Sequence, residues 1–111
     1  MARIARGHLR LSSVSVTTDS TAATAISFRD FAGGVLTPST TVNGGTYHFN
    51  SAPTSTGAFV PIYDEDDSAA TLAISSTERR AYEIPKACYG ASWLAITTTG
   101  TADVVDVNLK G

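Results

Sequence analysis

Two histidines and one cysteine are the side chains best suited to acid–base or nucleophilic chemistry. His8 and His48 lie in separate segments where polar and apolar residues alternate, so we expect both to face solvent. Cys88 is the sole cysteine, which excludes an intrachain disulfide and a zinc site built from several thiolates of this chain. We interpret Cys88 as a small buried hydrophobic residue, because a reactive thiolate needs a base beside it.

The spacing of these residues assembles no nucleophile, base and orienting group. The chain has neither a G-x-S-x-G elbow nor a G-x-x-x-x-G-K phosphate loop. We therefore predict no enzymatic activity, no catalytic residue, no cofactor and no metal centre. The acidic run Asp64, Glu65, Asp66 and Asp67 has two interpretations. It offers oxygen ligands for calcium or magnesium but lacks the glycine and distal glutamate of an EF-hand loop, so it is either a cation site or a solvated turn.

Basic residues gather at the start of the chain, before the first acidic residue, Asp19. We predict that four of them bind a partner: Arg3, Arg6, His8 and Arg10. Residues 1–11 would form either a strand with a basic face or an arm that becomes ordered on the partner. The formal net charge of the whole chain is −2, which argues against a nucleic-acid partner because phosphates require a basic surface.

The hydrophobic pattern also limits the cellular setting. The sequence has neither a run of about 18 apolar residues, as a membrane-spanning helix requires, nor the apolar stretch of a secretory signal. We expect a protein made in a cytoplasm, with no membrane partner.

Alternating side chains predict strands along most of the chain. Charged residues make up only 16% of it, and Thr, Val, Ile and aromatic residues favour a pleated sheet. Residues 24–28, 70–74 and 104–109 alternate with period two. Leu9 and Leu11 have the opposite parity to Val14 and Val16, which predicts a bulge or break between them, at residues 12–13.

Turn residues predict how these strands connect. Asn43, Gly44 and Gly45 separate two strand-like segments and predict a hairpin. Residues 50–57 predict an exposed loop, and Pro61 an edge strand. Residues 86–92 allow one helical turn, and we expect Trp93 in the core. Together these features predict one all-β domain over residues 1–111, a β-sandwich or small barrel of about eight short antiparallel strands, with a jelly-roll order among the options.

The last half of the chain carries short motifs that resemble a known class of protein. The motifs are Tyr-Glu-Ile-Pro-Lys-Ala-Cys-Tyr at 82–89, Trp-Leu-Ala-Ile at 93–96, Val-Asn-Leu-Lys-Gly at 107–111 and Phe-Val-Pro-Ile-Tyr-Asp at 59–64. They resemble small β-rich virion structural proteins of tailed bacteriophages, including capsid decoration or cement proteins.

This resemblance implies a non-enzymatic protein of the virion that stabilises the capsid through contacts between subunits. Its partner would be the major capsid protein or another virion protein, and a homo-oligomer, trimer or dimer, would follow capsid symmetry. Its place would be the capsid surface of a virion assembled in the host cytoplasm. The alternative is a β-sandwich binding module of a phage tail, for host attachment or carbohydrate. Its candidate rings are Tyr47, Tyr63, Tyr82 and Trp93.

Overall fold

Alternating apolar residues build most of the strands in a computed structural model of the chain. The structure describes residues 8–20, 22–28, 31, 33–38, 42–78 and 80–110. Within these ranges the elements are β1 (His8–Val16), β2 (Ile26–Ser27), β3 (Gly33–Pro38), β4 (Gly45–Ala52), β5 (Val60–Pro61), β6 (Thr71–Ile74), β7 (Tyr82–Glu83), the 3-10 helix η1 (Lys86–Cys88), β8 (Trp93–Thr98) and β9 (Asp103–Lys110).

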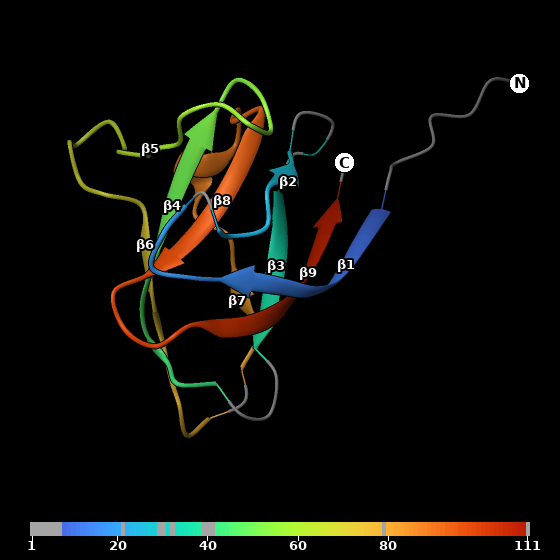
Figure 1. The fold of residues 1–111 in the computed structure, drawn as a ribbon, viewed down its shortest axis with the longest axis vertical. Coiled ribbons are helices and arrows are strands. Elements are labelled where there is room, and N and C mark those ends of the chain that lie inside the picture. The colour runs from blue at the N-terminus through green and yellow to red at the C-terminus, as the bar shows by residue number, and fades with distance from the viewer. Residues whose placement is uncertain are drawn as a thin grey trace, which may run out of the picture.

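The strands form two antiparallel sheets that together make a β-sandwich (Figure 1). The first sheet has four strands in the order β1-β9-β3-β7. The second has five, in the order β2-β8-β4-β5, with β6 also paired to β4. The predicted all-β class is confirmed, and of the two predicted architectures the sandwich is the one found.

The core lies between the two sheets and follows the period-two pattern. Val105, Val107 and Leu109 of β9 are buried, and the residues between them are half-buried or exposed. On the opposite, five-stranded sheet, Leu94 and Ile96 of β8 are fully buried in the same core. A sheet that is apolar on one face only must cover that face, and a second sheet of the same kind does so.

A bulge in β1 confirms the predicted change of parity. The pairing of β1 with β9 shifts between Leu11 and Val14. Ser13 lies inside this shift and has a φ angle of 59°, a left-handed conformation that is uncommon outside glycine. The bulge lets Leu11 pair with Val107 and Val14 with Val105, so both halves of the strand direct their apolar residues to the same face.

The predicted hairpin at residues 43–45 is wrong. β3 belongs to the four-stranded sheet and β4 to the five-stranded sheet, so the chain crosses between the sheets here. Gly44 and Gly45 do adopt positive φ angles, 76° and 103°. Positive φ allows a sharp change of direction, but it does not determine which strand the chain pairs with afterwards.

The predicted loop at 50–57 is wrong in its first three residues, because β4 extends to Ala52. Asn50 is buried within the strand, and its side-chain amide donates to Ala95 O at 3.1 Å and to Thr97 Oγ1 at 3.1 Å. These bonds compensate for burying a polar side chain that is usually found in turns. Residues 53–57 form the predicted loop, and β5, which contains Pro61, lies at the predicted sheet edge.

Candidate functional site

The predicted partner-binding residues fall on or before the first strand. Arg3 and Arg6 lie outside the described residues, and His8 is the first residue of β1. Arg10 is exposed on the outer face of the four-stranded sheet, where its guanidinium lies 3.6 Å from the Asp106 carboxylate. Residues 8–11 pair with β9, so this part of the basic segment is an integral strand.

The acidic run forms a solvent-exposed turn. One carboxylate oxygen of Asp64, Oδ1, accepts hydrogen bonds from the backbone N–H groups of Asp66 and Ser68, both at 2.9 Å. Asp67 completes the turn with a φ angle of 63°. Across the described ranges, no three His, Cys, Asp or Glu side chains gather in a metal-binding arrangement. Hydrogen bonds within the turn, from backbone N–H groups to the Asp64 side chain, account for its conformation.

A buried carboxylate that the sequence analysis missed joins three segments of the chain. Asp103 is 6% exposed. Its Oδ1 accepts from Asn43 N at 2.7 Å and Asn43 Nδ2 at 2.9 Å, and its Oδ2 accepts from Gly44 N at 3.2 Å and the Tyr47 hydroxyl at 2.7 Å. Four donors satisfy the two oxygens, so the group has a structural role.

Asp103 also affects the tyrosine bound to it. Tyr47 is fully buried. Burial, followed by the hydrogen bond to Asp103, raises the pKa of Tyr47 above its ordinary value of 10.0. The sequence does indicate that Asp103 is buried, because Asp103 shares the inward parity of Val105, Val107 and Leu109.

Cys88 is inside the core, as predicted. The thiol is fully buried at the end of η1, and burial raises its pKa from 9.0 to about 12. A thiol that stays protonated at neutral pH is a poor nucleophile, so Cys88 fills space in the core.

The four candidate rings of a tail binding module do not share one surface. Tyr47 is buried, whereas Tyr63 is 56% exposed. Tyr82 is half-buried in the four-stranded sheet, and its hydroxyl accepts a hydrogen bond from Ser75 N at 2.9 Å. The set therefore does not form a single ring platform.

The expectation that Trp93 lies in the core is wrong. Trp93 is only half-buried and belongs to β8 of the five-stranded sheet. Leu94 and Ile96 take the inward positions of β8, so strand parity turns Trp93 to the outer face.

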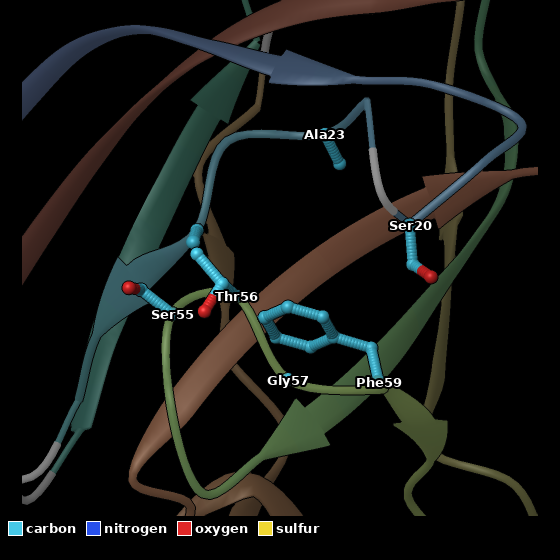
Figure 2. Close-up of a pocket in the computed structure, with 7 residues that line it drawn as sticks. Ser20, Ala23, Ser55, Thr56, Gly57 and Phe59 are labelled. Atoms are coloured by element: carbon cyan, nitrogen blue, oxygen red, sulfur yellow. The ribbon is translucent and has the colours of Figure 1, made fainter.

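The outer face of the five-stranded sheet is partly covered by two loops. Ala95 has the outward parity on β8, yet it is fully buried. Between the loops lies a cleft of about 240 Å³ (Figure 2). Its seven described lining residues are Ser20, Ala23, Ala25, Ser55, Thr56, Gly57 and Phe59. Every one of these side chains is uncharged, so the cleft offers hydroxyl groups and an aromatic ring.

Comparisons of the chain with protein-family models, with curated proteins and with solved structures gave no match. In the described part of the chain, no helix has both the length and the apolar character needed to cross a membrane.

Proposed function

We propose that this chain is a non-enzymatic structural protein of a tailed-phage virion, and specifically a capsid decoration protein. Its partner in this proposal is the major capsid protein, and it acts as a homo-oligomer on the outer surface of the shell. The resemblance of the last half of the chain to small β-rich virion structural proteins of tailed bacteriophages supports this role. The observation that carries the proposal furthest is the position of the basic strand β1 at the edge of its sheet.

The first half of β1 is accessible to a partner. Near the other end of the strand, Ser15 N donates to Thr24 Oγ1 at 2.9 Å and Thr24 N donates to Ser15 O at 3.2 Å. Residues 8–11 have no strand on that side within the described ranges. An open strand edge is a surface to which another chain can add.

The outer face beside this edge also suits docking. Arg10, Asn108 and Val35 form one row across β1, β9 and β3. Val35 and Val104 are exposed apolar residues on this face. Protein interfaces combine apolar contacts with a polar rim, and a decoration protein has to bury such a surface across neighbouring capsid subunits.

Replacing the three predicted arginines tests the role of this edge. We expect Arg3→Ala, Arg6→Ala and Arg10→Ala together to weaken attachment to capsids while leaving the melting temperature of the isolated chain nearly unchanged. The Arg10–Asp106 pair is exposed, and exposed ion pairs contribute only about 0–1 kcal/mol. Co-sedimentation with undecorated capsids measures attachment, and circular dichroism measures melting.

The matched control removes positive charge elsewhere on the surface. Arg80 and Lys86 are both exposed and lie outside β1, so the double variant Arg80→Ala, Lys86→Ala should attach nearly as well as the unmodified chain. Equal losses of attachment in the two variants would reject the basic edge as the docking surface.

The tail binding module remains the second candidate, because of one observation. The cleft of Figure 2 combines a ring with hydroxyl groups, although its ring is Phe59 and none of the four candidate rings lines it.

A further inference from the structure

Two loops of different origin form the cleft on the outer face of the five-stranded sheet. One follows β1 and contributes Ser20, Ala23 and Ala25, and the other joins β4 to β5 and contributes residues 55–57 and Phe59. Figure 2 shows the Phe59 ring between Thr56 on one side and Ser20 on the other, with the Ala23 methyl group directed toward the same space.

Backbone hydrogen bonds support both walls. In the first loop, Ala22 N and Ala23 N donate to Asp19 O at 3.0 and 3.1 Å, and the Thr17 hydroxyl donates to the same oxygen at 2.6 Å. In the second, Gly57 N donates to Thr54 O at 3.2 Å. A Cβ on Gly57 would lie 2.8 Å from Thr54 Oγ1, so glycine permits this tight turn. Walls supported in this way lower the ordering cost of binding.

The polar groups of the cleft are free to bind a ligand. Among the described residues, the hydroxyls of Ser20, Ser55 and Thr56 form no hydrogen bond with the protein. A hydroxyl both donates and accepts a hydrogen bond. An apolar occupant would bury these hydroxyls unpaired, which is unfavourable.

An anion is also a poor fit. All seven described lining residues are uncharged, so an anion would lose hydration without gaining a cationic partner.

The volume of the cleft, about 240 Å³, lies just below the roughly 300–1,000 Å³ typical of sites for drug-sized ligands. The cleft therefore suits a small, neutral ligand with several hydroxyl groups and one face able to pack on a ring.

We infer that this cleft binds one ring of a neutral saccharide. The C–H face of the sugar packs against Phe59, and its hydroxyls exchange hydrogen bonds with Ser20 and Thr56. This site goes beyond the proposed capsid role, and it can exist whether or not the chain occupies a virion.

Titration of the ¹⁵N-labelled chain tests the inference by amide chemical shifts. The probes are the methyl glycosides of glucose, galactose and N-acetylglucosamine, with sodium phosphate and 1-butanol as the anionic and apolar alternatives. We expect at least one glycoside to shift the amides of Ala23, Thr56 and Gly57 saturably, and neither alternative to do so.

Three variants connect these shifts to the cleft. Phe59→Ala should weaken glycoside binding by roughly tenfold or more, because the packing face is lost. Thr56→Val keeps the side-chain shape but removes the hydroxyl, so it should also weaken binding. The matched control is Tyr63→Ala, which removes an exposed ring outside the cleft and should bind as the unmodified chain does.

Three results would overturn the inference. They are the absence of saturable shifts with all three glycosides, glycoside shifts that persist unchanged in Phe59→Ala and Thr56→Val, and butanol or phosphate shifting the same amides more strongly than any glycoside. Should Phe59→Ala fail to fold, Thr56→Val together with Ser20→Ala gives the same comparison.

Discussion

Asp103 shows how one buried charge can connect parts of a chain that lie far apart in the sequence. Its four hydrogen bonds join the first residue of β9 to Asn43 and Gly44 on the crossing between sheets and to Tyr47 of β4. A charged acceptor strengthens each bond. Loss of a single donor should therefore measurably destabilise the fold.

Tyr47→Phe removes one such donor and keeps the ring. We expect the free energy of unfolding to fall by about 1–3 kcal/mol, because Asp103 Oδ2 is left with a poorer set of donors in a buried site. Urea unfolding measures it as a lower midpoint at unchanged slope. Tyr63→Phe is the matched control, since Tyr63 is 56% exposed and its change should leave the midpoint in place. Equal effects in the two variants would contradict the structural role of Asp103.

The raised pKa values of two buried side chains predict a loss of stability in alkaline solution. Burial raises the pKa of Cys88 from 9.0 to about 12 and raises that of Tyr47 above 10.0. Above about pH 9 the unfolded chain therefore loses protons that the folded chain keeps, so the free energy of unfolding falls as pH rises.

Urea unfolding between pH 8 and pH 11 tests this dependence. Cys88→Ala should reduce the part of the fall that begins near pH 9, because that variant has no thiol to titrate. A flat profile in the unmodified chain would show that these groups titrate alike in the folded and unfolded states.

The role of single residues was predictable where it follows from residue type alone. Cys88 was expected in the core, because an isolated cysteine behaves as a small hydrophobic residue, and it is buried there. Trp93 was also expected in the core, but strand parity directs it outward. Asp103 was missed, although its parity with Val105 marked it as facing inward.

At the scale of elements, β1 depends on one unusual residue. Ser13 has a φ angle of 59° and also donates its backbone N–H to Asp106 Oδ1 at 3.3 Å. The bulge at this residue keeps Leu11 and Val14 on the same face. Without it, the alternation of side chains would expose one half of the strand's apolar residues.

Ser13→Val should destabilise the protein by about 1–3 kcal/mol, because β-branched residues are disfavoured at positive φ. Ser13→Gly should be neutral or slightly stabilising, since glycine adopts this conformation readily. Thermal unfolding compares these two variants with Ser12→Val, which alters the neighbouring exposed residue. If Ser12→Val and Ser13→Val destabilise alike, the left-handed position is not what limits β1.

The sequence predicted elements well where a regular pattern was long enough to read. β9, β6 and the bulge in β1 follow from alternation. β2, β5 and β7 are two residues long, so neighbouring strands define them more than their own residues do. The connection at 43–45 was mispredicted because a local φ requirement contains no information about the next pairing partner.

At the scale of the whole molecule, the sandwich has two unlike flanks. On one, Thr98 N donates to Thr17 O at 2.9 Å and ties the end of β1 to β8. On the other, Ser75 N donates to the hydroxyl of Tyr82 and ties β6 to β7. The start of β1 and β5 therefore lie on opposite sides (Figure 1).

The two edges differ in how readily they accept another strand. Pro61 lies in β5, and the acidic turn follows shortly after it. Proline and like charges both discourage strand addition. This asymmetry supports β1 as the edge used in the proposed docking. Alternation predicted a β-sandwich or a small barrel, whereas the division of strands between the sheets depends on contacts distant in sequence, which local patterns do not encode.

The most direct test of the proposed role is electron cryo-microscopy of virus particles purified from the biological source of this chain. We expect density for the sandwich on the outside of the shell, repeated with capsid symmetry, with the β1 edge facing the major capsid protein. Purified virions that lack this chain, or that hold it only inside the shell, would contradict it.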